Sequence, residues 1–366
     1  MGSGIRMKAT GIREGSEMED SRLVSVVVGS YNGADFLSET VDSILAQTYK
    51  NIELILVDDG SKDRTLEIMR QYERMDARVH VLHQKNSGAS AARERGYRAS
   101  TGGYIILSDD DDVWSPYLIE DVMKVSDRFP DAEVVATFNR RVRDFHEISN
   151  YSWEKNLQND ILGKPQAMSG HDFGLKYRCN TDIRPGFFWG MLFQRAFMER
   201  MVEAFMKVKE KMPTHYFNDS FCASRVSGMA KKIVVTNQIH ILYRVCPTSL
   251  SHKSTVSLHV KHYVYALEEE LDFYKSLGWK DVYNEVLPGG YLVVLRSWFM
   301  VYAHEKNEQE RTEYFAEIRR LYDKYINDLK KIPKKGWKER GIYWSILLWD
   351  KHPKLWFRLI RMLRGW

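Results

Sequence analysis

Short apolar runs alternate with segments of helical spacing over the first 130 residues of the chain. Strands that are covered on both faces need near-continuous apolar side chains, so these runs predict buried strands. The expected strands are 24–28, 53–57, 79–83 and 104–107. Between and after them, apolar residues lie three and four positions apart, which predicts amphipathic helices. The expected helices are 36–47, 64–74, 89–99 and 117–128. This alternation indicates an α/β fold with a mostly parallel sheet flanked by helices.

The pattern changes beyond these elements. A fifth strand is expected near 133–138, and the stretch 140–185 is polar and irregular. A helix at 195–212 and a strand at 232–236 follow, and from about residue 256 the spacing is helical and rich in aromatic and charged residues. The expected organisation is a polar leader at 1–20, an α/β domain at 21–255 with halves 21–116 and 117–255, and a helical C-terminal region at 256–366.

Polar clusters follow three of the expected strands. They are Ser30-Tyr31-Asn32, Asp58-Asp59 and Asp109-Asp110-Asp111-Asp112. Ligands of open α/β sheets bind at the carboxyl ends of the strands, so we expect the three clusters to share one edge. Each cluster alone also fits a simpler interpretation: a strand-end aromatic residue, a turn with a helix cap, or an acidic first helical turn.

The four consecutive aspartates are the sharpest of these features. Adjacent carboxylates repel one another unless a cation or hydrogen-bond donors neutralise them. Mg²⁺ and Mn²⁺ prefer oxygen ligands, commonly one or two carboxylates together with substrate phosphates. Such an ion can polarise a phosphate leaving group. The first cluster adds an aromatic platform, and the second adds a carboxylate that can accept from a ring N–H group. Together the three clusters indicate a nucleotide-diphosphate site.

Five motifs in residues 24–112 occur in the order and spacing of a known family. They are Val-Ser-Val-Val-Val-Gly-Ser-Tyr-Asn-Gly (24–33), Ser-Ile-Leu-Ala-Gln-Thr-Tyr (43–49), Leu-Val-Asp-Asp-Gly-Ser-Lys-Asp-Arg-Thr (56–65), Asn-Ser-Gly-Ala-Ser-Ala-Ala-Arg (86–93) and Thr-Gly-Gly-Tyr-Ile-Ile-Leu-Ser-Asp-Asp-Asp-Asp (101–112). The segment resembles the nucleotide-binding half of the family 2 glycosyltransferases, which have the Rossmann-like GT-A fold. Gly29 stands where the family usually has Pro.

The resemblance implies roles for individual residues of the donor site. Tyr31, flanked by Ser30 and Asn32, would stack on the base, and Asp59, with Asp58, would accept hydrogen bonds from it. Arg93 would lie near the diphosphate. Asp109 and Asp111 form the D-x-D pair, with Asp111 as the leading metal ligand. Asp109 or Asp110 would meet the ribose or the Mn²⁺ or Mg²⁺ ion.

A candidate catalytic base follows from the same resemblance. An inverting transfer needs one carboxylate that deprotonates the acceptor hydroxyl. The segment 216–225 resembles the family's Glu-Asp…Arg segment, with Asn218 at the Glu position and Asp219 as the base. The alternative for Asp219 is a helix N-cap.

Two further segments resemble the acceptor half of the family. Trp189, in Gly-Phe-Phe-Trp-Gly (186–190), is a candidate platform for a sugar ring beside Asn218, and a plain core role fits it equally well. The segment Tyr-Arg-Val-Cys (243–246) resembles the family's Tyr-Arg-x-His, but Cys246 replaces the His. His252 lies nearby as a substitute.

Composition narrows the class of protein. A hydrophobic fraction of 44% with 28% charged residues is typical of a folded globular chain. Three cysteines are too few for a disulfide framework and favour a reducing compartment. Neither a transmembrane helix nor a signal peptide is expected from the apolar stretches. These features predict a cytoplasmic protein.

The charge is concentrated at one end. Residues 328–366, the basic tail, contain eleven basic and three acidic side chains, a net charge of +8, whereas the whole chain carries +5. They also contain five of the ten Trp residues. A basic amphipathic helix near 354–366 would suit an anionic membrane surface, and the alternative is a helix packed on the domain with its basic side in solvent. No nucleic-acid module accompanies the charge, so no nucleic-acid partner is expected.

These features together predict an inverting, metal-dependent glycosyltransferase. Its donor would be a nucleotide-diphosphate sugar, most simply a UDP-sugar, and its acceptor a saccharide or lipid-linked saccharide in surface polysaccharide or glycan synthesis. One rival is a sugar nucleotidyltransferase, although the loop at 29–33 has no basic residue for a triphosphate. The other rival is a catalytically degenerate membrane-associated scaffold.

Overall fold

The structure is a computed structural model. It describes residues 22–142, 147–148, 150–154, 164–178, 188–209, 219–245, 260–304 and 307–332, together with residues 341, 344–346, 348–349, 351–352 and 355. The chain forms two compact units, which are described separately. The first comprises Met1–Ala167, Pro185–Lys207 and Lys231–Arg244, and the second comprises Met168–Arg184, Val208–Ala230 and Val245–Trp366. The domain division expected at residue 256 stays a prediction.

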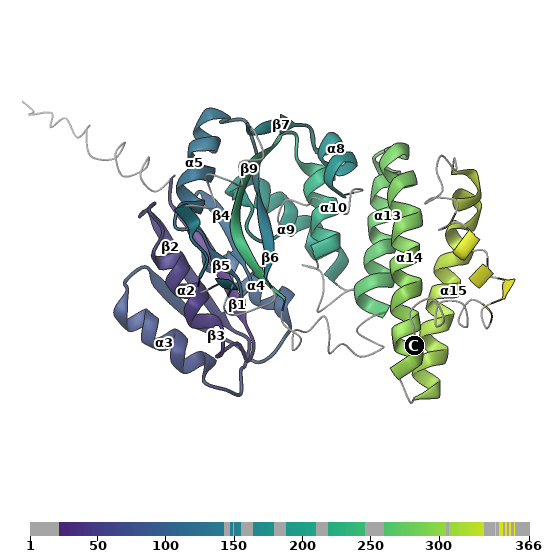
Figure 1. Cartoon of the computed structure of the whole chain (residues 1–366), viewed down its shortest axis with the longest axis horizontal. Helices are drawn as coiled ribbons and strands as arrows, with labels where there is room; N and C mark the ends of the chain where they lie inside the picture. The colour runs from purple at the N-terminus through teal and green to yellow at the C-terminus, as the bar shows by residue number, and fades with distance from the viewer. Residues whose placement is uncertain are drawn as a thin grey trace, which may run out of the picture. The chain divides into compact units, whose positions relative to one another are not determined.

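A mixed sheet forms the centre of the first unit (Figure 1). Its parallel part has the order β3-β2-β1-β4. The bounds are β1 (Val24–Ser30), β2 (Ile52–Asp58), β3 (Val79–His83) and β4 (Tyr104–Ser108). Val24 lies opposite both Ile52 and Tyr104, and Ser30 lies opposite Asp58. The carboxyl ends of these strands are therefore aligned, as the polar clusters require.

Shorter and longer strands extend the sheet beyond β4. The order continues β8-β6-β9-β5, with β7 paired to β9. The β4–β8, β8–β6 and β9–β5 pairs are antiparallel, and the β6–β9 pair is parallel. The bounds are β5 (Val113–Trp114), β6 (Val134–Val142), β7 (Gln166–Met168), β8 (Leu192–Gln194) and β9 (Ile233–Arg244). Strand β9 runs beyond the expected 232–236 because its second half pairs with β6 and β5.

Helices cover both faces of this sheet. The helices of the first unit are α2 (Leu37–Leu45), α3 (Thr65–Met75), α4 (Ala89–Ala99), α5 (Leu118–Arg128) and most of α9 (Arg195–Lys209). Alternate strand residues such as Val26 pack in one core with Val41 of α2 and Ile119 of α5. On the other face α4 comes so close that a Cβ at Gly96 would lie 2.3 Å from Val27 Cγ1. The predicted α/β fold is confirmed.

The second unit is helical. Its elements are α8 (Gly170–Phe173), a π-helical turn η1 (Gly174–Arg178), α10 (Asp219–Met229), η2 (Val260–Tyr265), α13 (Ala266–Ser276), α14 (Lys280–His304) and α15 (Glu308–Lys331). Helices α13, α14 and α15 lie side by side (Figure 1). An aromatic-rich core joins them, and it includes Tyr274, Tyr291 and Tyr325. Ile346 and Trp349 of the basic tail are buried in the same core. In the part of the chain that the structure describes, no helix has both the length and the apolar character to cross a bilayer.

Candidate active site

The loop after β1 is fixed to the loop after β2. Asn32 has a φ of 56°, in the left-handed region that Asn tolerates better than most residues. Its backbone N–H donates to Ser61 Oγ at 2.9 Å, and its side-chain Oδ1 accepts from the Lys62 N–H at 2.8 Å. The Gly33 N–H donates to Thr65 Oγ1 at 2.9 Å. These bonds fix the loop directly after Tyr31.

Tyr31 is the exposed aromatic residue of this edge. Its side chain is 38% exposed, although large apolar side chains in the sheet around it are buried. An aromatic ring with an open face can stack on a planar ligand, because both partners have π-faces. The ring is therefore available at the edge where the sequence predicts a base.

The two carboxylates at the end of β2, Asp58 and Asp59, are buried and bonded to the chain. Asp58 Oδ2 lies 2.7 Å from His83 Nδ1 at the end of β3. Asp59 accepts from Gln84 Nε2 at 2.7 Å and from the N–H groups of Ser87 and Gly88 at 2.8 Å. Asp59 thus fixes the turn that leads into α4. A carboxylate has about four lone-pair sites, so these three bonds leave room for one further donor.

The acidic cluster, Asp109 to Asp112, lies at the carboxyl end of β4. Arg93 Nη2 donates to Asp109 Oδ1 at 2.6 Å, and the Ser30 hydroxyl donates to Asp110. Asp109, Asp111 and Asp112 each offer a carboxylate oxygen, and these oxygens all lie within 4.8 Å of one another. The geometry brings together both residues of the predicted D-x-D pair, and it adds Asp112, which sequence reasoning quoted without a role.

Burial and mutual repulsion weaken the acidity of this cluster. Burial, reinforced by the negative charges of neighbouring aspartates, raises the pKa of Asp111 to about 7. Burial likewise raises the pKa of Asp110 to about 6, against the hydrogen bond from Ser30. The pKa of the fully buried Asp112 is raised well above its usual value by the same causes. Full ionisation of the cluster is therefore unfavourable in these surroundings.

The residues present fit a divalent cation. Three converging carboxylates supply the hard oxygen ligands that Mg²⁺ and Mn²⁺ take, and a cation would favour the ionised forms that burial disfavours. Asp109, Asp111 and Asp112 are the residues that would hold it.

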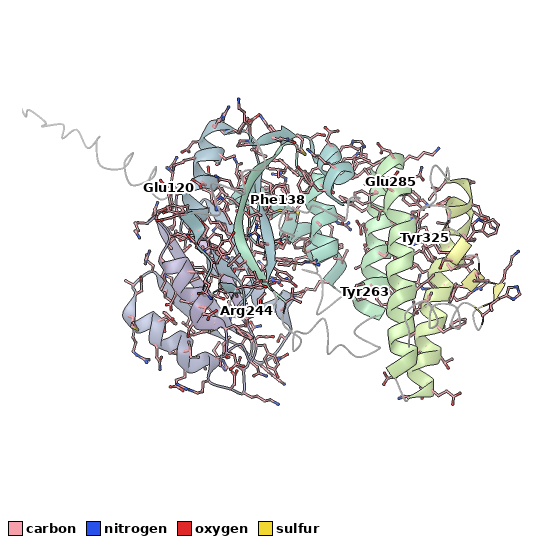
Figure 2. All side chains as sticks on the ribbon, viewed as in Figure 1. Glu120, Phe138, Arg244, Tyr263, Glu285 and Tyr325 are labelled. Atoms are coloured by element: carbon pink, nitrogen blue, oxygen red, sulfur yellow. The ribbon has the colours of Figure 1, made fainter. Side chains whose placement is uncertain are left out.

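Arg244 joins the acidic cluster to the sheet and to α2. Figure 2 labels this residue at the end of β9. Its N–H donates to Asp112 Oδ1 at 3.3 Å, and its Nε donates to the Asp111 carbonyl oxygen at 3.0 Å. The guanidinium also pairs with Glu39 and lies 4.6 Å from the centre of the Phe36 ring. The motif at 243–246 was the available signal, but it drew attention to Cys246 rather than to Arg244.

The predicted acceptor residues are described unequally. Trp189 is 4% exposed and lies 5.6 Å from the Tyr243 ring, centre to centre, and its indole opposes only in part the burial that raises the pKa of Asp112. Asp219 is the first residue of α10, in the second unit. The side chain of Asp219 and the whole of Asn218, Cys246 and His252 lie outside the described residues.

Several glycosyltransferases are similar in sequence to parts of this chain. Residues 25–197 match the model of "Glycosyl transferase family 2". The chain is 29% identical over 259 residues to the "Uncharacterized glycosyltransferase EpsJ" of Bacillus subtilis, covering 70% of this chain and 71% of the relative. It is 33% identical over 149 residues to the "Putative teichuronic acid biosynthesis glycosyltransferase TuaG" of Bacillus subtilis, covering 38% and 59%. It is 46% identical over 117 residues to "Glycosyltransferase GlyG" of Streptococcus pneumoniae, covering 31% and 38%. The match thus spans less than two thirds of the latter two relatives.

Solved structures share the fold. The crystal structure of S. aureus TarS 1–349 has a TM-score of 0.59 at 13% identity and covers 88% of this chain and 83% of that chain. The same TarS fragment in complex with UDP-GlcNAc has an equal TM-score. At this identity the likeness concerns the fold alone. The five motifs and the family match agree that residues 25–197 are similar to glycosyl transferase family 2, and the architecture is that of the GT-A fold.

Proposed function

We propose that the protein is an inverting, metal-dependent glycosyltransferase that takes its sugar from a nucleotide-diphosphate donor, preferably UDP-linked. The observation that carries the proposal is the acidic cluster, in which Asp109, Asp111 and Asp112 converge at the carboxyl end of β4. The UDP-GlcNAc complex of a structural neighbour supports the choice of a UDP-linked donor, and the teichuronic acid name of a relative supports a role in surface polysaccharide synthesis. The proposed acceptor is a saccharide or lipid-linked saccharide.

The donor would be held by the loops of the sheet edge. Tyr31 stacks on the base, and Asp59 uses its remaining lone-pair site for a ring N–H. Arg93, already bonded to Asp109, faces the diphosphate. A Mg²⁺ or Mn²⁺ ion at Asp109, Asp111 and Asp112 supplies Lewis-acid stabilisation of the diphosphate leaving group.

Asp219 acts as the base in this proposal. Its carboxylate takes the proton of the acceptor hydroxyl while that oxygen forms a bond to the anomeric carbon of the sugar. The bond to the diphosphate breaks on the opposite face, and its electron pair leaves with the nucleotide diphosphate, so the anomeric configuration inverts. Trp189 and Asn218 are the proposed acceptor contacts.

Calorimetric titration of the protein with UDP tests the donor site, with and without Mn²⁺. Binding that requires Mn²⁺, or is strengthened by it, supports the proposal. If neither UDP nor another nucleoside diphosphate binds, the proposed function is wrong.

Asp219→Asn tests the base. Transfer to the acceptor should fall by about 10²-fold or more, the lower range of general-base contributions, because an amide cannot take the proton. UDP affinity and the circular dichroism spectrum should not change. Asp131→Asn, which alters an exposed acid of the first unit, is the matched control. Near-normal turnover of Asp219→Asn would remove this residue from the mechanism.

We propose further that residues 341–366 attach the protein to an anionic, cytoplasmic membrane face. Trp344 is 65% and Leu355 47% exposed, whereas Ile346 and Trp349 anchor the same segment in the helical core. Exposed aromatic and apolar side chains beside basic ones suit the interface of a bilayer. Flotation with phosphatidylglycerol vesicles should recover the full chain, and a chain shortened at 340 should stay unbound. Equal, negligible recovery of both would contradict the attachment.

A further inference from the structure

Helix α10 is mostly buried between Phe221 and Ser227, although this stretch contains polar residues. Phe221, Cys222 and Val226 are fully buried, as expected of a core helix. Ser224 and Ser227 are fully buried too, and Arg225 is only 6% exposed. Buried polar groups are costly without partners, so the contacts of these side chains determine how the helix is held.

Arg225 connects α10 to α13 through its guanidinium group. Its Cζ lies 3.9 Å from the centre of the Phe273 ring and 4.3 Å from that of Phe221. Its Nη2 lies 3.8 Å from the Glu269 carboxylate, and its Nη1 donates to the Glu269 carbonyl oxygen at 3.5 Å. Burial lowers the pKa of Arg225 to about 10, so the group remains charged at neutral pH. We call Arg225, Phe221, Glu269 and Phe273 the Arg225 cluster.

Neighbouring contacts fix the rotation of α10 about its axis and its position along that axis. Ser227 Oγ lies 3.0 Å from the Tyr274 hydroxyl oxygen, and both groups are buried. A Cβ at Gly228 would lie 2.2 Å from Phe273 Cε1, so only glycine allows this approach to α13. A Cβ at Gly170 of α8 would lie 2.0 Å from the Ser227 carbonyl oxygen. Helix α10 is therefore closely packed against two elements of the second unit.

Asp219 is the first residue of this helix, six positions before Arg225. We infer that Arg225 is a positioning residue for sugar transfer, which holds α10 against α13 and thereby fixes the place of Asp219. The inference rests on the proposed function, because it takes Asp219 as the base. It also makes α13, the first long helix of the C-terminal region, a part that transfer requires.

The chemistry of arginine suits this task better than an apolar residue would. A guanidinium group stacks flat on aromatic rings and at the same time donates in fixed directions, so it resists both rotation and sliding of the helix. Catalytic geometry is sensitive to such movement, since a displacement of about 1 Å can cost on the order of 10²-fold in rate.

Arg225→Met and Arg225→Lys in the full chain test the inference by two readouts. In Arg225→Met, kcat for transfer should fall about 10-fold or more, while the affinity for UDP with Mn²⁺ stays within twofold of wild type. Hydrogen exchange of the amides at 219–224 should become at least 10-fold faster. Arg225→Lys keeps the charge but not the planar stacking. Its kcat and its hydrogen exchange at 219–224 should therefore lie between those of wild type and Arg225→Met. Arg319→Met is the control, because the side chain of Arg319 on α15 is 43% exposed and also lies over a tyrosine ring.

Phe273→Leu provides the same test if Arg225→Met fails to fold, because it keeps Arg225 and removes the closer ring of the cluster. It should lower kcat and speed exchange at 219–224 in the same direction. Suppose that Asp219→Asn loses transfer as expected, but a folded Arg225→Met or Phe273→Leu variant has unchanged kcat and hydrogen exchange. The role of Arg225 would then be wrong, and the proposed function would stand. A wild-type protein that does not bind UDP or transfer sugar, or an Asp219→Asn variant that remains active, would overturn the proposed function and this inference with it.

Discussion

The two units of the molecule shift the pKa values of their carboxylates in opposite directions. In the second unit Glu268 accepts from Arg320 Nη2 at 2.6 Å and from Lys324 Nζ at 2.8 Å, and these partners lower its pKa to about 2. In the first unit burial and neighbouring aspartates raise the pKa of Asp111 to about 7. A further acid of the second unit, Asp272, accepts a hydrogen bond of 2.6 Å from the Tyr325 hydroxyl. Figure 2 labels Tyr325 on α15.

The difference separates acids that hold the fold together from acids kept for a ligand. A carboxylate matched by basic side chains stabilises the folded state at neutral pH. A buried cluster short of positive partners destabilises the protein by itself, and such strain is commonly found at functional sites. The acids of α13 are therefore structural, and those after β4 are the candidates for binding a cation.

Asp111→Asn should have the largest effect among these variants. Transfer in the presence of Mn²⁺ should fall by about 10²-fold or more, similar to the loss of one preorganised electrostatic contact. Without metal the melting temperature should stay constant or rise, because the amide removes a negative charge from the cluster. Turnover and thermal unfolding of the same preparations measure both effects. A stability loss of several degrees, or normal Mn²⁺-dependent turnover, would show that Asp111 is a structural acid.

Glu268→Gln should lower stability, unlike Asp111→Asn, and its effect should be smaller. The free energy of unfolding at pH 7 should fall by about 2 kcal/mol, because two basic groups lose their charged partner. The folded-state pKa of Glu268 is lowered to about 2 from 4.5, so its stabilisation is present above about pH 4.5 and is lost as the pH falls toward 2. The gap between variant and wild type in urea unfolding should therefore narrow from pH 5 to pH 3.

An exposed ion pair provides the control for Glu268. Arg22 and Asp127 lie 2.6 Å apart, with side chains 46% and 48% exposed. Asp127→Asn should change stability by no more than about 0.5 kcal/mol, since water screens such pairs. A loss as large as that of Glu268→Gln would mean that burial does not explain the difference.

The parallel strands could be predicted to within one or two residues, because strands buried on both faces require apolar runs. The run before Asp109 is an example: the expected strand 104–107 is β4, Tyr104–Ser108. Ser30, Asp109 and Asp111 could be placed together for the same reason, since parallel strands end at one edge. Arg93 lies on α4, and only the family resemblance placed it near them.

The remainder depends on contacts between distant parts of the chain. Arg244 lies 133 positions after Asp111, and only the pairing of β9 with β5 and β6 brings the two together. Strand β8, which joins the two parts of the sheet, is three residues long and has too few positions for a period to show. Arg225 belongs to the motif at 216–225, but its contacts with Phe273 and Glu269 could not be predicted, because a buried arginine and an exposed one have the same sequence signal.

The bonds of Asn32 have a consequence for the speed of binding. Its contacts to Ser61 and Lys62 shape the loop around Tyr31 in the protein alone. The conformational entropy of this loop is therefore lost during folding, and a ligand that arrives at the edge meets a formed surface. Encounters at this loop are then governed by diffusion and orientation, rather than by the time that a chain segment needs to find its shape.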